Sequence, residues 1–170
     1  VSIPGGEPLI HKEMPQIVEG IIARKKFVYL CTNALLLRKR INDYKPSPYL
    51  TFSIHLDGLK DRHDASVCQE GVFDIAVEAI KLAIGKGFRV NVNCTLFQGE
   101  TPEEVAEFLD YAMELGVEGV TIACAPEGAG FTAGVNCCGF VGKTGGGGAD
   151  LTGAGAGGAE AAGVDGTTLS

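Results

Sequence analysis

The stretch Leu50-Thr51-Phe52-Ser53-Ile54-His55-Leu56-Asp57 alternates apolar and polar side chains along its whole length. Alternation with a period of two predicts a β-strand whose two faces meet different surroundings. A parallel strand covered by helices on both faces is normally a continuous run of Val, Ile and Leu. The stretch therefore predicts a strand with an apolar face against helices and a polar face toward another kind of space.

The same alternation recurs in the segments on either side of this stretch. The polar positions of those segments are Ser2, Tyr29, Cys31, Asn33, Asn91, Asn93, Thr95 and Thr121. One face of the whole predicted sheet is therefore polar and the other is apolar. If the apolar face packs on helices, the polar face lines a lumen that holds a ligand; the alternative is an open sheet with one face in water.

Helical periodicity appears between the predicted strands. Strands are expected at 1–3, 27–32, 50–56, 89–96 and 119–123, and helices at 13–24, 34–42, 72–84 and 102–115. In the helix 72–84 we expect Ile75, Ala79, Ile80 and Ala83 to face the core, and 57–71 is predicted to be a loop. Five βα steps in a row predict an α/β fold with a parallel sheet and right-handed crossovers.

Composition bounds the class of protein. The 170 residues suit one domain, and the net charge of −7 with a pI near 4.9 disfavours a nucleic-acid-binding surface. No apolar run approaches the roughly 18 residues of a membrane helix. The six cysteines lack the spacing of a disulfide scaffold or of a C-x-x-C metal site. We therefore expect a cytoplasmic protein with no metal ligands of its own.

The composition changes after Ala123. Residues 124–170 hold 15 of the 25 glycines and show neither strand nor helix period. Such a segment buries too little apolar surface to offset the entropy of ordering it, so we expect a barrel unit at 1–123 and a disordered tail at 124–170. The tail is interpreted either as a gene read out of frame beyond Ala123 or as a flexible glycine-rich linker.

The motif Gly5-Gly6-Glu7-Pro8 follows the first predicted strand. Adjacent glycines allow positive φ and a close approach of the backbone to a ligand. The Glu7 carboxylate suits a cationic amino group rather than a phosphate, and Pro8 begins the next segment with a fixed φ. The alternative is an ordinary strand-to-helix turn.

Three strand-end motifs in order, Gly5-Gly6-Glu7-Pro8, Thr32-Asn33 and His55-Leu56-Asp57-Gly58, resemble the radical S-adenosylmethionine superfamily. The resemblance implies a partial (β/α)₆ barrel, of which this chain supplies the second to sixth strands. It implies S-adenosylmethionine as cofactor, with the first motif at its amino group. The ribose contact falls on Ser53, His55 or Asp57, and Asn93 belongs to the same cofactor-binding set.

The superfamily also implies a [4Fe–4S] cluster held by a C-x-x-x-C-x-x-C motif. No such spacing occurs among residues 1–170, and the ligands are expected upstream of Val1. Without them we expect this chain by itself to be inactive. His11 and His63 are expected to be solvated or capping residues rather than metal ligands.

The amino-acid sequence resembles that of the radical enzymes of bacterial hopanoid biosynthesis in the stretches 1–13, 23–36, 55–58, 63–71 and 89–97. That resemblance implies transfer of a 5′-deoxyadenosyl group to a hopene, an electron donor for the cluster, and peripheral contact with the inner face of the membrane that supplies the hopene. Radical addition to an alkene needs one hydrogen atom afterwards, and Cys31, on the polar face, is the predicted catalytic thiol. Cys94 is predicted to face the helices.

Two other functions remain open from the sequence. One is a radical S-adenosylmethionine maturase that acts on a peptide or a cofactor precursor. The other is a barrel without catalytic activity that binds a nucleotide or a partner.

Overall fold

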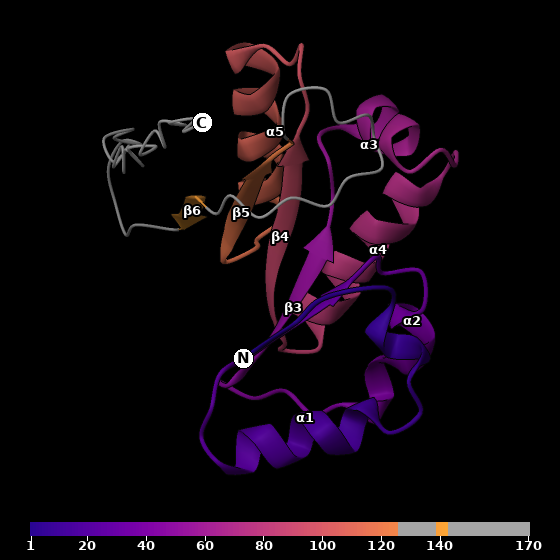
Figure 1. The fold of residues 1–170 in the computed structure, drawn as a ribbon, viewed down its shortest axis with the longest axis vertical. Coiled ribbons are helices and arrows are strands. Elements are labelled where there is room, and N and C mark those ends of the chain that lie inside the picture. The colour runs from indigo at the N-terminus through magenta and orange to yellow at the C-terminus, as the bar shows by residue number, and fades with distance from the viewer. Residues whose placement is uncertain (126–138, 143–170) are drawn as a thin grey trace, which may run out of the picture.

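The computed structural model describes residues 1–125 and 139–142. Its sheet has the strand order β1-β2-β3-β4-β5-β6. The strands are β1 (Ser2–Ile3), β2 (Val28–Thr32), β3 (Leu50–His55), β4 (Arg89–Leu96), β5 (Gly119–Cys124) and β6 (Gly139–Gly142). The first five run parallel and β6 pairs antiparallel with β5. The parallel strands form a curled half-barrel (Figure 1), which confirms the predicted α/β partial barrel.

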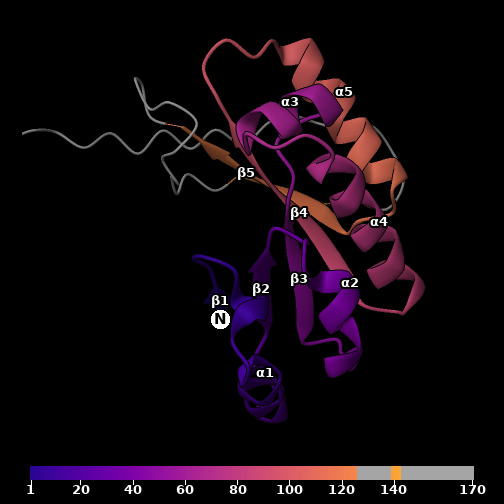
Figure 2. The same cartoon turned by 90° about the vertical axis from the view of Figure 1, so that its right-hand side faces the viewer.

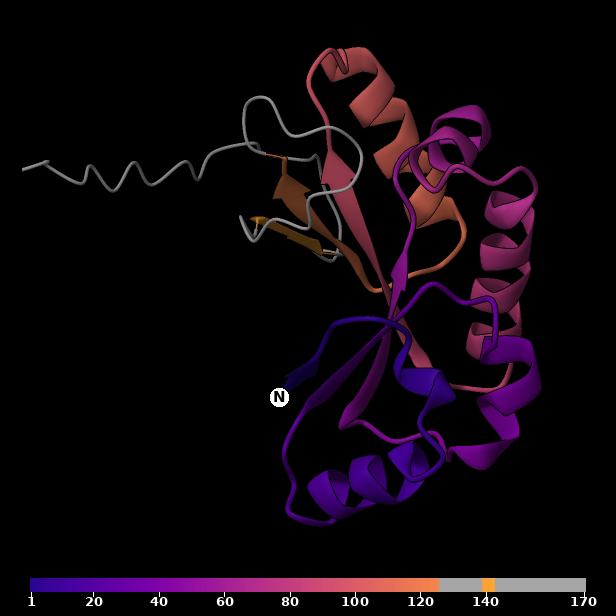
Figure 3. The ribbon, with the colours of Figure 1, turned by 45° about the vertical axis from the view of Figure 1, so that its right-hand side comes forward.

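Helices connect the parallel strands. They are α1 (Met14–Ala23), α2 (Leu37–Arg40), α3 (Lys60–Ser66), α4 (Val72–Gly85) and α5 (Pro102–Glu114), with 3₁₀ turns η1 (Pro8–Ile10) and η2 (Ile41–Asp43). Figure 2 shows α2, α3, α4 and α5 on the same side of the sheet, and Figure 3 shows that they cover one face. No helix in the described part of the chain has the length and apolar character needed to cross a bilayer.

The two faces of the sheet differ as the alternation predicts. On the helix side, Leu30, Phe52, Ile54 and Val92 have no exposed surface, and burying each such side chain stabilises the fold by about 1.5–3 kcal/mol. The opposite face carries the polar rows. The parallel register places Cys31 beside Ser53 and Ser53 beside Asn91, and it places His55 beside Asn93 and Asn93 beside Thr121.

Two predicted helices differ from the structure. The helix expected at 34–42 is only one turn of α2 followed by η2. In α4, Ile75 does not face the core, because its side chain is 42 % exposed. Ala79, Ile80 and Ala83 are buried as predicted. Phe73 also belongs to the buried side, and Ile75 lies about 200° around the helix from it.

The prediction of a loop over 57–71 is wrong, because α3 spans Lys60–Ser66. This short helix has no apolar period for the sequence to reveal: its buried residues are His63, Asp64 and Ser66. Hydrogen bonds replace apolar packing on its inner side. The Asp64 carboxylate, for example, accepts the N–H groups of Gly71 and Phe73 at the start of α4, at 2.7 and 2.8 Å.

The predicted tail is described only in part. Its residues 139–142 form β6, although no strand is expected there from the sequence. The remainder of the tail beyond residue 125 lies outside the described residues.

Candidate cofactor site

Two consecutive glycines follow β1 at the edge of the sheet where the parallel strands end. Gly5 has φ +89° and Gly6 has φ +49°, both in the left-handed region that side chains disfavour. A Cβ built on either glycine would meet no atom within 4 Å. Glycine is therefore needed for the backbone conformation, and the space beside this backbone is open to a ligand.

Glu7 fixes the end of this turn to the next strand. Its carboxylate accepts the Leu9 N–H at 3.0 Å, the Thr32 hydroxyl at 2.9 Å and the Asn33 N–H at 2.9 Å. These are three neutral donors for about four acceptor positions. No cation forms an ion pair with Glu7 within 1–125 and 139–142. A negative charge thus stands uncompensated beside open glycine backbone.

The segment after β2 turns sharply at Ala34, next to the two residues that donate hydrogen bonds to Glu7. Ala34 has φ +66°, which is rare for a residue with a side chain, and its N–H donates to the Thr32 Oγ1 at 3.0 Å. Thr32 thus holds the bend while its hydroxyl proton contacts Glu7. Such strain occurs where the surrounding structure over-determines the backbone, and functional sites are common among such places.

Cys31 and its neighbours lie on the polar face below this edge. Cys31 Sγ is 3.7 Å from the Ser2 Oγ, and its side chain is half-buried. The Asn91 amide donates to Thr121 Oγ1 at 3.1 Å, while its Oδ1 is buried without a partner in the described residues. Cys94 points to the helices as predicted, and burial raises the pKa of its thiol to about 12.

Asp57, at the end of β3, is a second carboxylate at the same edge of the sheet. It is 2 % exposed and accepts the Thr95 N–H at 2.7 Å, the Ser66 hydroxyl at 3.1 Å and His55 Nε2 at 2.9 Å. Burial acts to raise the pKa of Asp57, but the bond and charge of His55 and the Thr95 N–H outweigh it and lower the pKa. All the donors around Asp57 come from the protein itself.

His55 is the exposed member of this pair. Burial acts to lower the pKa of His55, but the Asp57 carboxylate, together with a backbone bond to Asn93, raises it above its ordinary value. About a third of the His55 side chain is exposed. Of the predicted ribose contacts, Ser53 is 6 % exposed and Asp57 only 2 %. The geometry therefore leaves more surface for a ligand on His55 than on the other two.

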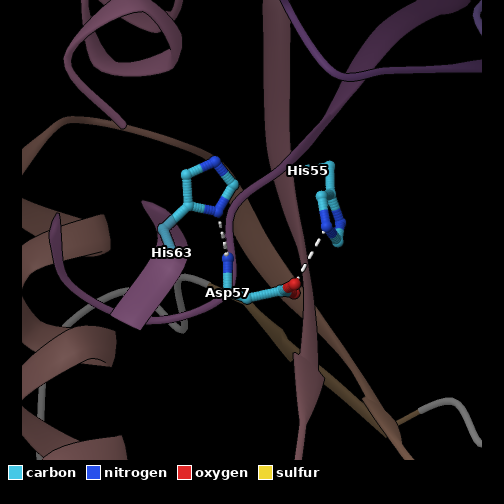
Figure 4. A group of neighbouring side chains, drawn as sticks. All are labelled: His55, Asp57 and His63. Carbon is cyan, nitrogen blue, oxygen red and sulfur yellow. Dashed lines mark hydrogen bonds and ion pairs between the residues drawn. The ribbon is translucent and has the colours of Figure 1, made fainter. Parts of the chain in front are cut away.

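His63 is buried, which corrects the expectation of a solvated or capping residue. Its side chain is 1 % exposed, and its Nδ1 accepts the Asp57 N–H at 3.0 Å (Figure 4). The pairing of His63 and Ser66 three residues apart, just after a strand end, was the available sequence signal. Without an apolar period around it, that signal did not indicate a helix.

His55, Asp57 and His63 are close enough to suggest a metal site, since one ligand atom from each lies within 4.8 Å of the others. The hydrogen bonds argue against one. The Asp57 N–H occupies Nδ1 of His63, so the proton of the neutral ring sits on Nε2 and blocks it as a ligand. The Asp57 carboxylate is already surrounded by protein donors.

A cavity of about 450 Å³ lies on the helix side of the sheet, next to the segment that follows Asp57. Leu59, Cys94, Leu96, Val105 and Phe108 are among its lining residues. Cys94 and Leu96 are helix-facing positions of β4, so the cavity opens behind the sheet. It does not belong to the face that carries Glu7 and Cys31.

The family model of the radical SAM superfamily matches residues 1–112. The chain belongs to this superfamily. Its members use S-adenosylmethionine and a [4Fe–4S] cluster, and the predictions of the family and of both cofactors at that level are confirmed.

Curated relatives include two bacterial GTP 3′,8-cyclases. The Helicobacter pylori protein is 28 % identical over 114 residues, which cover 66 % of this chain and 36 % of that protein. GTP 3′,8-cyclase 1 of Mycobacterium tuberculosis is 26 % identical over 125 residues, with 69 % and 35 % coverage. The chain thus spans about a third of the length of these relatives.

Solved structures show the same fold. Streptococcus suis SuiB superposes with a TM-score of 0.65 at 22 % identity, over 80 % of this chain and 31 % of SuiB. A structure of SuiB bound to S-adenosylmethionine gives 0.63 at 22 % identity, over 75 % of this chain and 30 % of that one. Archaeal TYW1 gives 0.54 at 16 % identity, over 72 % and 42 %.

The described residues fit one of the two cofactors. Glu7 and the open backbone of Gly5 and Gly6 suit the amino group of S-adenosylmethionine. The described cysteines 31, 68, 94 and 124 do not gather into a cluster-binding group. No chemical step is therefore assigned to a cluster on these residues.

Proposed function

We propose that this chain forms the S-adenosylmethionine-binding wall of a radical enzyme that modifies a small molecule. The observation that carries the proposal is the Glu7 carboxylate, which has no cationic partner in the described structure and lies beside exposed glycine backbone with open space. A polar lumen adjoins it. When bound, S-adenosylmethionine supplies this family with a 5′-deoxyadenosyl radical.

The residues of the chain have separate tasks in this proposal. Glu7 accepts a hydrogen bond from the cofactor's ammonium group at its remaining acceptor position. Gly5 and Gly6 let the cofactor approach the backbone, and Pro8 begins the turn whose Leu9 N–H steadies Glu7. His55 lines the cofactor's ribose side, with Ser53 and Asn93 as its neighbours in the lumen.

The test of this site is the affinity for S-adenosylmethionine, measured by calorimetry in a full-length protein that carries the cluster. Glu7→Gln keeps the size of the side chain and removes its charge. Because a hydrogen bond to a charged group contributes about 1.5–3 kcal/mol, we expect the affinity to fall about 10–100-fold. Glu13→Gln, at an N-cap without a side-chain bond, is the matched control and should bind normally. Equal affinity in both variants would contradict the proposal.

We infer that the substrate is a cofactor precursor. Curated relatives that match two thirds of the chain include GTP 3′,8-cyclases. They also include the molybdenum cofactor biosynthesis protein moc-5 of Caenorhabditis elegans, 28 % identical over 120 residues, with 69 % coverage of this chain and 20 % of that protein. On this reading the substrate occupies the polar lumen lined by the face that carries Cys31, His55 and Asn93.

Adenosyl transfer to a hopene is the second candidate, and Cys31 is the observation that favours it. Its thiol lies on the lumen face beside Ser2. It could return one hydrogen atom to the substrate carbon, and the resulting sulfur radical would then need an electron and a proton from the donor that reduces the cluster. This candidate also requires peripheral access to the membrane that holds the hopene.

Cys31→Ala, made in a full-length protein that carries the cluster ligands, separates the two candidates. If the enzyme adenosylates an alkene, the variant should still form methionine from S-adenosylmethionine but release no reduced adenosylated product. If it matures a cofactor precursor, product formation should continue. Cys68→Ala, an exposed cysteine, is the control. Iron and sulfide analysis of the full-length, anaerobically prepared protein tests the remaining alternative, because absence of iron would favour a binding barrel without a cluster.

A further inference from the structure

His63 combines deep burial with an incomplete set of hydrogen bonds. Its Nδ1 accepts the Asp57 N–H at 3.0 Å, and its Nε2 is buried without a partner in the described residues. A buried polar atom without a partner costs free energy, so a residue of this kind needs an explanation. We explain the burial of His63 by the hydrogen bond that its Nδ1 accepts from Asp57.

His63 Nδ1 accepts the first backbone N–H beyond the end of the β3 ladder. The last ladder-type bond at the end of β3 joins the Leu56 N–H to the Asn93 carbonyl at 3.0 Å. The next N–H along the chain, that of Asp57, points to His63 instead. The His63 ring is thus the acceptor that fixes the Asp57 peptide just beyond the strand.

The helix α3 holds Asp57 at two points. His63 holds its peptide, while the Ser66 hydroxyl contacts the Asp57 carboxylate at 3.1 Å and the His63 carbonyl at 2.8 Å. The other carboxylate oxygen faces β4. With these contacts made, Oδ2 stands 2.9 Å from His55 Nε2 (Figure 4).

We propose that His63 is a positioning residue, whose Nδ1 orients Asp57 so that the Asp57 carboxylate fixes the His55 ring on the lumen face. The effect on the His55 ring follows from the contacts of the chain itself. The consequence for cofactor binding rests on the proposed function, which places His55 beside the ribose.

The electrostatic surroundings keep His63 in the form that this role requires. Burial lowers the pKa of His63 and the charge of His55 lowers it further, while Asp57 and Asp64 oppose them. If Nδ1 carried a proton, it would be a donor facing the donor N–H of Asp57, and the hydrogen bond could not form. The neutral ring with its proton on Nε2 is therefore the form that can hold Asp57.

The chain offers a direct readout, because it has only three histidines and His11 is an exposed internal reference. NMR titration reports the pKa of each imidazole in the ligand-free protein. In His63→Leu, which removes the acceptor, we expect the pKa of His55 to fall toward or below its ordinary value. In His63→Asn, whose Oδ1 can replace Nδ1, we expect the pKa of His55 to stay as in the wild type. His11 should not change in either variant.

A His55 pKa that is the same in His63→Leu as in the wild type would overturn the proposal. If His63→Leu does not fold, the wild-type protein still decides. Long-range ¹⁵N spectra at neutral pH should show His63 protonated on Nε2 alone. A proton on Nδ1 would mean that the Asp57 N–H is not held by this ring.

The affinity for S-adenosylmethionine separates this inference from the proposed function. If both hold, His63→Leu should bind the cofactor about tenfold more weakly and His63→Asn should bind it normally. If the His55 pKa falls in His63→Leu while the affinity is unchanged, the positioning role stands and the contact between His55 and the cofactor is wrong.

Discussion

Glu7 and Asp57 are two carboxylates at the same edge of the sheet, and each joins the end of one parallel strand to the next. Glu7 accepts the Asn33 N–H after β2, and Asp57 accepts the Thr95 N–H in β4. Parallel strands leave backbone groups without ladder partners where they end, and a carboxylate can satisfy them. Both residues therefore have a structural task that follows from the fold.

The two carboxylates differ in what compensates their charge. Asp57 is 2 % exposed and is paired with the His55 ring, whose protonated form balances the charge inside the protein. Glu7 receives only neutral donors and lies beside open glycine backbone. The comparison teaches that residues of the same type at equivalent strand ends can serve the fold in one case and a ligand in the other, and that charge balance distinguishes them.

Removal of the Asp57 carboxylate should give the largest effect. In Asp57→Ala the part-buried Thr95 N–H and the His55 ring lose their acceptor, and the Ser66 hydroxyl keeps only the His63 carbonyl. We expect the free energy of unfolding to fall by about 3–5 kcal/mol, measured by urea denaturation. Asp61→Ala, exposed on the neighbouring helix α3, should change it by about 0.5 kcal/mol or less. If Glu7→Ala destabilises the protein as much as Asp57→Ala, the two carboxylates do not differ in the way described.

A substitution in the glycine turn tests whether the backbone beside Glu7 is specialised for a ligand. Gly6→Ala places a side chain at φ +49°, where open space excludes a clash but the conformation itself is disfavoured. We expect a loss of about 1–2 kcal/mol in the free energy of unfolding, together with weaker binding of S-adenosylmethionine. Gly85→Ala is the control, because that glycine lies in α4, and the same substitution should stabilise the protein by about 0.5–1 kcal/mol. Destabilisation of equal size in both variants would show that the turn is not special.

Thr32 tests the support of Glu7. In Thr32→Val the Glu7 carboxylate loses a donor and the Ala34 N–H loses its acceptor, so we expect a loss of about 1 kcal/mol in the free energy of unfolding. Thr32→Ser keeps the hydroxyl and should retain most of that stability. The affinity for S-adenosylmethionine should follow the same order. An affinity that is equal in both variants would mean that Glu7 does not need Thr32 for its orientation.

The two histidines near Asp57 should give opposite and smaller pH effects. The pKa of His63 is lowered in the fold, so stability falls as the pH drops below about 6.5, where the unfolded chain takes up a proton that the folded chain does not. The pKa of His55 is raised, so its contribution is present below about 6.5 and is lost as the pH rises through the folded value. Urea unfolding between pH 5 and 8 should therefore show a maximum near 6.5.

Two variants test which histidine causes the loss of stability on each side of the maximum in this pH profile. His63→Asn should flatten the acidic side and leave the alkaline side, whereas His55→Asn should do the reverse. A profile that His63→Asn leaves unchanged would contradict the role assigned to burial at His63.

Much of the fold was predictable because period two is a geometric property of a strand. Phe52, Ile54 and Val92 occupy the helix-facing side as predicted, and α5 (Pro102–Glu114) lies within the helix predicted at 102–115. Prediction was wrong where buried contacts are polar. The helix α3 buries His63, Asp64 and Ser66, and such contacts leave no apolar period in the sequence. Ile75 was misplaced because several apolar residues of α4 offer more than one plausible stripe.

The sequence by itself determined the superfamily, the polar and apolar faces of the sheet, and the strand ends at which Glu7, His55 and Asp57 occur. Only the tertiary structure decided which carboxylate has its charge balanced within the protein, because that depends on donors far away in the chain. The Thr95 N–H reaches Asp57 across 38 positions, and the Asn33 N–H reaches Glu7 across 26. Hydrogen bonds at such separations depend on the register of the folded strands, and no local pattern of residues encodes them.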